Sequence, residues 1–199
     1  MALQQMSTFI NIMPGENRSC IGCHEPRRNA PRLATRPTAI RSPAETLKPQ
    51  PGDAGVRMVD FVADVQVTIN KHCIKCHSGE KPKGNLDLAG VPIGKFSRSY
   101  DNLTTNGLMN YRACQSGSAH IEAVPPLTHG AISSKLIAQI LNNHGKAKVS
   151  RNELIRIATW IDANVPYYGT YRGKRDIRDK DHPEFRALPL VAAPPAKQR

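Results

Sequence analysis

Residues 59–77 read Val-Asp-Phe-Val-Ala-Asp-Val-Gln-Val-Thr-Ile-Asn-Lys-His-Cys-Ile-Lys-Cys-His, and this stretch decides the fold. Four apolar residues in it share one helical face: Phe61, Val62, Val65 and Ile69. This spacing predicts a helix over 59–72. The helix would run straight into a pentapeptide with two cysteines and a histidine, Cys73-Ile-Lys-Cys76-His77.

The same C-x-x-C-H pattern occurs earlier in the chain, as Cys20-Ile-Gly-Cys23-His24. Two thiols one helical turn apart can add to the two vinyl groups of one haem, and the next histidine can then ligate the iron. The sequence therefore predicts two covalently bound haem c groups. One would be held by the first motif (Cys20–His24) and the other by the second motif (Cys73–His77), with His24 and His77 as axial ligands.

Other uses of paired cysteines fit the spacing less well. A zinc ribbon needs two C-x-x-C pairs about 15–20 residues apart, whereas 49 residues separate Cys23 from Cys73. A redox dithiol would accompany a βαβ unit, which the pattern lacks. Zinc remains the main alternative to haem. The fifth cysteine, Cys114, has no charged neighbour to activate it, so a buried inert thiol is expected.

Two further helices are predicted in the second half of the chain. Residues 133–143 carry an apolar face, and Ser150 with Glu153 forms a capping box that starts a helix ending near Val165-Pro166. Residues 89–132 are rich in Gly, Pro, Asn and Ser, and we expect loops there. The expected fold class is mainly α with long irregular loops, namely a cytochrome c-like haem domain preceded by a haem-bearing extended segment.

The sixth ligands of the haem irons are less evident. His144 lies four residues after Ile140, at the end of the apolar helix face, so it could enter the pocket of the second haem. The alternative is a helix-terminal histidine that the helix dipole favours. Weaker candidates for either haem are His129 and His120, which lie in an expected loop. Met109 is a further option. His72 is not a candidate, because it abuts Cys73 and cannot reach the opposite face of the ring.

The chain divides by composition into three parts. Residues 1–50 contain the first motif and a Pro-rich linker, residues 51–185 form the expected cytochrome domain, and residues 186–199 form a tail expected to be disordered. Aromatic residues make up only 5% of the sequence, so two haems would supply apolar bulk that the side chains lack.

The formal net charge of +12 invites a nucleic-acid interpretation, but the basic residues are scattered and no nucleic-acid motif accompanies them. A solvated basic surface is the simpler interpretation, and attraction of an acidic redox partner is its expected use. No stretch approaches the roughly 20 apolar residues of a membrane span. The N-terminus has no secretory signal pattern, although c-type haem is attached outside the cytoplasm.

Several stretches resemble the hydrazine synthase alpha-subunit-like proteins of planctomycetes. The residues around the first motif are similar to that family's first haem site, and the others to planctomycete-type cytochrome c modules. The matching stretches are Phe9–Arg27, His72–Leu88, Phe96–Tyr100, Ser133–Leu136 and Thr159–Tyr168.

This resemblance implies that a β-propeller and the export signal precede the chain in a larger parent protein of the periplasm or another extracytoplasmic compartment. It also implies that His144 caps the second haem in bis-histidine fashion. One position departs from the family: its first haem is ligated by a Tyr four residues past the motif histidine, where this chain has Arg28. A guanidinium cannot ligate iron, so the family's unusual catalytic site is not expected.

The expected function is electron transfer by a dihaem c-type cytochrome. The alternative is a haem enzyme of nitrogen metabolism, with catalysis at the first haem. That alternative stays open because the Pro-rich linker after His24 offers no local sixth ligand, and an open iron is a requirement for substrate chemistry.

The motif count makes a direct prediction of cofactor stoichiometry. After expression with the haem-attachment machinery, the intact mass should exceed that of the polypeptide by two haem groups, which survive acid–acetone extraction because they are covalent. Mass spectrometry of the purified chain measures this. A mass equal to the polypeptide plus one zinc ion would contradict it.

Overall fold

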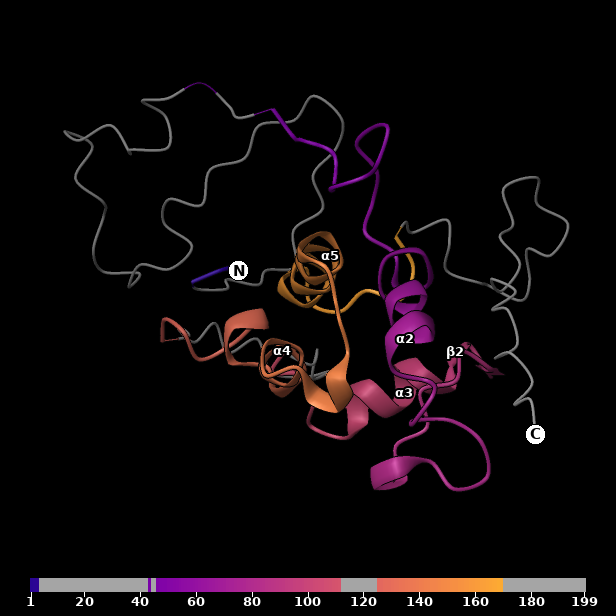
Figure 1. Cartoon of the computed structure of the whole chain (residues 1–199). Coiled ribbons are helices and arrows are strands. Elements are labelled where there is room, and N and C mark those ends of the chain that lie inside the picture. Colours follow the sequence, from indigo (N-terminus) through magenta and orange to yellow (C-terminus); the bar gives the residue numbers. More distant parts are fainter. Residues whose placement is uncertain (4–42, 44–45, 112–124, 170–199) are drawn as a thin grey trace, which may run out of the picture.

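The computed structural model describes residues 1–3, 43, 46–111 and 125–169 (Figure 1). The first motif, Cys114, His120 and the expected tail lie outside these ranges. Within them the chain is mostly helical, which confirms the expected class. No helix among the described residues has the length and apolar character that crossing a membrane requires.

The predicted first helix forms in two parts. Residues Phe61–Gln66 make a π-helix, η1, which continues directly into α2 (Val67–His72). Asp60 starts η1, because its Oδ1 accepts hydrogen bonds from the backbone N–H groups of Val62 and Ala63 at 3.0 and 3.1 Å.

After the second motif, the described residues contain three α-helices and short connecting elements. The α-helices are α3 (Arg98–Thr105), α4 (Lys135–Leu141) and α5 (Arg151–Asp162). Short 3-10 turns are η2 (Lys83–Asn85), η3 (Ala131–Ser133) and η4 (His144–Lys146). An antiparallel hairpin pairs β1 (Pro92–Ile93) with β2 (Phe96–Ser97).

Two of these elements differ from the sequence prediction. The expectation of loops throughout 89–132 is wrong for α3 and for the hairpin. Helix α3 begins where Ser97 Oγ accepts the N–H of Tyr100, and it buries Leu103 completely. Its sequence, Arg-Ser-Tyr-Asp-Asn-Leu-Thr-Thr, is poor in strong helix formers, so tertiary packing rather than propensity holds it.

Helix α5 follows its prediction closely at the start and ends earlier than expected. Ser150 and Glu153 form the capping box. The helix ends at Asp162, three residues before Val165, and the Trp160 indole N–H donates to the Pro166 carbonyl 2.8 Å away.

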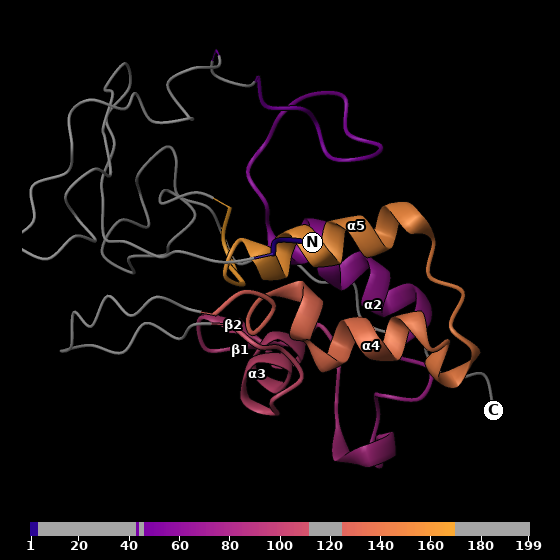
Figure 2. The same cartoon turned by 90° about the vertical axis from the view of Figure 1, so that its left-hand side faces the viewer.

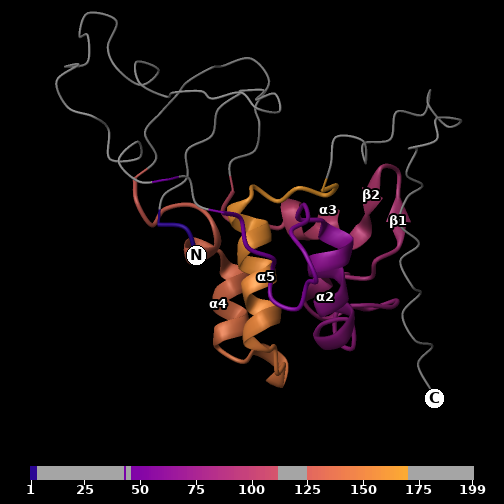
Figure 3. The ribbon, with the colours of Figure 1, turned by 90° about the horizontal axis from the view of Figure 1, so that it is seen from above.

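An aromatic cluster fixes α5 against η1, and Figure 3 shows α5 lying between α2 and α4. Phe61 and Trp160 are fully buried with ring centroids 5.2 Å apart. Tyr100 from α3 and Tyr167 after α5 complete the cluster around Phe61, at 5.1 and 5.6 Å. Burial of such rings supplies much of the stabilisation available to so small a core.

A cluster of charges attaches the segment before η1 to α5. Asp64 is almost fully buried and accepts hydrogen bonds from Arg57, at 3.0 Å, and from Arg156, at 2.7 Å. Arg156 also donates to the Pro51 carbonyl at 2.7 Å and to Asp53. The hydrogen bond from Arg156 lowers the pKa of Asp53. The buried carboxylate is thus compensated by two guanidinium groups.

The aromatic cluster predicts a large loss of stability on truncation of its centre. Phe61→Ala should lower the free energy of unfolding by about 3–5 kcal/mol, because a buried ring is replaced by a cavity. Guanidinium denaturation followed by far-UV circular dichroism measures this. Val67→Ala, on the same continuous helix but at a side chain 60% exposed, is the control and should change stability by less than about 0.5 kcal/mol.

Candidate functional site

The second motif forms a hydrogen-bonded turn directly after the end of α2. The Cys73 N–H donates to Ile69 O at 2.8 Å, and the His77 N–H donates to Cys73 O at 3.0 Å. Both cysteines are free and half-buried. The two thiols and the histidine are therefore presented on a helical turn, the local geometry that covalent haem attachment needs.

The structure brings the imidazole of His144 close to that of His77. Their ring centroids are 6.1 Å apart and the ring planes differ by 31°. His144 opens the short turn η4, directly after Asn143, which has a φ of 51°. An asparagine in this left-handed conformation ends α4 and turns the chain, which delivers His144 to the end of α2. Figure 2 shows η4, the turn beyond α4, at the same end of the molecule as the end of α2.

This separation suits one metal ion between the two rings. Metal–imidazole bonds are about 2 Å long and the ring centre lies roughly 1 Å further back, so two imidazoles on opposite sides of one metal ion have centres about 6 Å apart. The observed 6.1 Å matches that value. Among the described residues, no group of three or more His, Cys, Asp or Glu side chains is arranged to hold a metal ion. A metal ion held between His77 and His144 would need only these two imidazoles from the described residues.

The environment of His77 fits an iron ligand. Its Nδ1 is buried and has no hydrogen-bond partner among the described residues, although buried polar atoms are ordinarily satisfied. The His77 carbonyl accepts a hydrogen bond from the Leu88 N–H at 2.7 Å, which holds the backbone of His77 in place. On the His144 side of the site, Leu141, three residues before His144, is 56% exposed.

The Cys73 thiol is unsuited to dithiol redox chemistry. Burial, with a smaller contribution from the neighbouring Cys76, raises the pKa of Cys73 to about 11. At neutral pH the group is therefore the neutral thiol. Reactive dithiols depend on the opposite shift, a lowered pKa that maintains a thiolate.

The remaining ligand candidates that the structure describes lie in other surroundings. Met109 is buried in the hydrophobic core, where it packs as an ordinary apolar side chain. His129 is half-buried and its Nδ1 is 3.0 Å from Thr128 Oγ1. Neither has a ring or side-chain contact with His77 that compares with that of His144.

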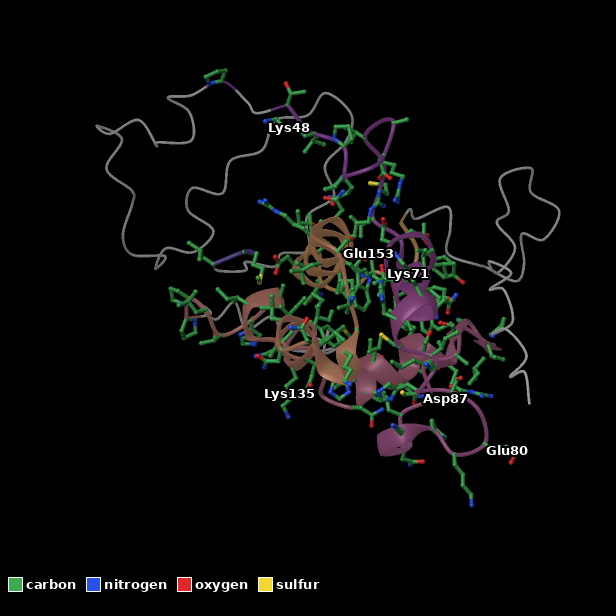
Figure 4. The ribbon with its side chains drawn as sticks, viewed as in Figure 1. Lys48, Lys71, Glu80, Asp87, Lys135 and Glu153 are labelled. Carbon is green, nitrogen blue, oxygen red and sulfur yellow. The ribbon has the colours of Figure 1, made fainter. Side chains whose placement is uncertain are left out.

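Glu153 has a role that the sequence prediction did not include. Besides its capping bond to the Ser150 N–H (2.7 Å), its carboxylate contacts Lys71 Nζ at 2.8 Å and His72 Nε2 at 3.2 Å. Figure 4 shows Lys71 and Glu153 side by side between α2 and α5. The capping box identified Glu153, but a tertiary contact to the residues before the second motif leaves no signal in local sequence. We call this group of four residues the Glu153 junction.

The junction changes the ionisation of its carboxyl group. Partial burial would raise the pKa of Glu153, but the hydrogen bonds from Lys71, Ser150 and His72 outweigh it and lower the pKa to about 2. The charged form is thus favoured in the folded state.

Scans against protein-family models, curated proteins and solved structures found no match to this chain.

The lowered pKa predicts a specific pH dependence. Stability from Glu153 is fully present above the unfolded-state pKa near 4.5 and is lost as pH falls toward 2. Glu153→Gln should therefore destabilise the protein at pH 6, and the difference from wild type should shrink by pH 3. Denaturant unfolding at the two pH values tests this. Glu80→Gln is the control, since Glu80 is exposed and should show no such difference. An equal effect of Glu153→Gln at both pH values would contradict the prediction.

Proposed function

We propose that this chain is a dihaem c-type cytochrome that transfers electrons. The single observation that carries the proposal is the proximity of two imidazoles, His77 from the second motif and His144 from η4, whose ring centroids are 6.1 Å apart. The two cysteines on the preceding helical turn supply thiols for covalent attachment. The first motif repeats the same residues, so the proposal includes a second covalent haem there.

The residues of the second site have distinct roles in this proposal. Cys73 and Cys76 would anchor the macrocycle through thioether bonds, and His77 and His144 would ligate the iron from opposite sides. A haem bound in this way supplies a one-electron carrier whose potential depends on ligand type and burial. With both axial positions taken by protein nitrogen, the second site is suited to electron transfer rather than to binding a substrate at iron.

The charge around the second site supports an acidic redox partner. Lysines 75, 81 and 83 surround the motif and are exposed, as are Lys146 and Lys148 beyond His144. None of these lysines belongs to an ion pair among the salt bridges of the described residues. Complementary charge speeds the encounter of redox proteins. The proposal includes an extracytoplasmic location, because c-type haem is attached outside the cytoplasm.

Replacement of His144 tests the proposal. His144→Ala should convert one low-spin haem to a high-spin form, because the iron above His77 loses its sixth ligand. Absorption and electron paramagnetic resonance spectra of the oxidised protein measure this. His129→Ala is the matched control and should leave the spectrum of the second haem unchanged.

The fold should tolerate the change at His144. Its side chain is exposed, and only a helix-dipole interaction of about 0.3–1 kcal/mol is at stake. If both haems keep their wild-type spectra in His144→Ala and change in His129→Ala, the assignment of the sixth ligand is wrong.

A further inference from the structure

We propose that Glu153 is a positioning residue that sets the separation of the two axial histidines. The inference rests on the proposed function, because it concerns how the chain holds His77 and His144 on either side of the iron. Among the described residues, the Glu153 carboxylate bonds to Lys71, His72 and Ser150 rather than to His77 or His144. It acts through the two chain segments that carry them, both of which are attached to its carboxylate.

The first segment is the end of α2. Lys71 and His72 are the last two residues of that helix, and both contact the Glu153 carboxylate, His72 Nε2 at 3.3 Å from Oε1 and 3.2 Å from Oε2. Beyond His72 the second motif forms hydrogen-bonded turns, in which the Cys73 N–H donates to Ile69 O and the His77 N–H donates to Cys73 O. These turn hydrogen bonds link the backbone of His77 to the end of α2, so they transmit the position of His72 to His77.

The second segment is the connection from η4 to α5. Glu153 Oε2 accepts the backbone N–H of Ser150 at 2.7 Å, and Ser150 Oγ accepts the N–H of Glu153. Ser150 lies six residues after His144, and η4 is closed by the N–H of Ala147 bonded to the His144 carbonyl at 3.1 Å. The same carboxylate thus holds one end of each ligand-bearing segment, His72 before His77 and Ser150 after His144.

Burial ranks the contacts of the junction. The His72 side chain is 9% exposed and that of Glu153 is 18% exposed, whereas Lys71 is 63% exposed. Exposed ion pairs contribute little, while charge-assisted hydrogen bonds away from solvent contribute more. The bond between His72 and Glu153 should therefore do most of the positioning, and Lys71 should add little.

The experiment measures how readily His144 leaves the iron in the reduced dihaem protein. Carbon monoxide can bind the second haem only after His144 dissociates from the iron, so binding to this haem should be slow. The slow phase is identified as the one that becomes fast in His144→Ala. Its rate therefore measures how readily His144 leaves the iron. Glu153→Gln should speed this phase roughly tenfold, the factor equivalent to one charge-assisted hydrogen bond. In the oxidised protein the low-spin fraction of the second haem should fall.

Matched variants separate positioning from charge and from general stability. Glu80→Gln removes the same charge three residues from His77 and should leave the phase unchanged. His72→Phe should speed it as Glu153→Gln does, whereas His72→Gln, which retains a side-chain N–H donor, should remain close to wild type. Lys71→Ala should change the rate less than about threefold.

A second readout needs no haem chemistry. Amide hydrogen exchange at residues 73–77 and 144–147 should accelerate together in Glu153→Gln, because both segments lose one anchor.

The outcomes distinguish the two proposals. A wild-type protein with no slow phase sensitive to His144→Ala would overturn the proposed function itself. A slow phase that Glu153→Gln and His72→Phe leave unchanged, or that Glu80→Gln speeds equally, would overturn the positioning role alone. Equal effects of His72→Gln and His72→Phe on the slow phase would also overturn the positioning role of Glu153. If Glu153→Gln does not fold, the two His72 variants test that role on their own.

Discussion

The contact between Phe61 and Trp160 is the constraint on which the described structure depends. Aromatic residues are few in this chain, yet the cluster around Phe61 draws rings from η1, α3, α5 and the segment after α5. Because both side chains are fully buried, α5 cannot slide along η1 without opening a cavity. With that crossing fixed, the direction of α2 beyond η1 and the place where α5 begins are fixed as well.

The candidate site follows from this crossing, at the far end of the same two helices. The second motif leaves the end of α2, and η4 lies just before the start of α5, so His77 and His144 come together although 66 residues separate them in sequence. Two polar groups adjust the arrangement. Asp64, buried between Arg57 and Arg156, ties the helices near Pro51, and Glu153 ties them next to the motif. A small core thereby holds a precise distance between two side chains on irregular segments.

The helices that depend on apolar spacing and on end-capping residues could be predicted from the sequence. The apolar spacing before Cys73 and the capping box at Ser150 specified two helices, and the structure confirms both. Helix α3 was missed because Ser, Asn and Thr compete with its own backbone for hydrogen bonds. It is stabilised by tertiary contacts: Leu103 and Ser99 are buried, and Tyr100 packs against the core. The hairpin was missed because two-residue strands carry no alternation to detect. His144 could be proposed from its position after an apolar helix, but the bond from His72 to Glu153 crosses 81 residues and depends wholly on the tertiary fold.

The same reasoning explains why His144, rather than the other candidates, is placed to pair with His77. A ligand must be free to leave its own surroundings at little cost. Met109 fills core volume, so withdrawing it would leave a cavity, and the His129 ring nitrogen already has a hydroxyl partner. His144 is exposed on a turn between residues with positive φ, Asn143 at 51° and Gly145 at 62°, and it gives up only water. Within the described part of the chain, the His144 imidazole is therefore the one that the proposed haem site could take as its sixth ligand without disturbing the core around Phe61.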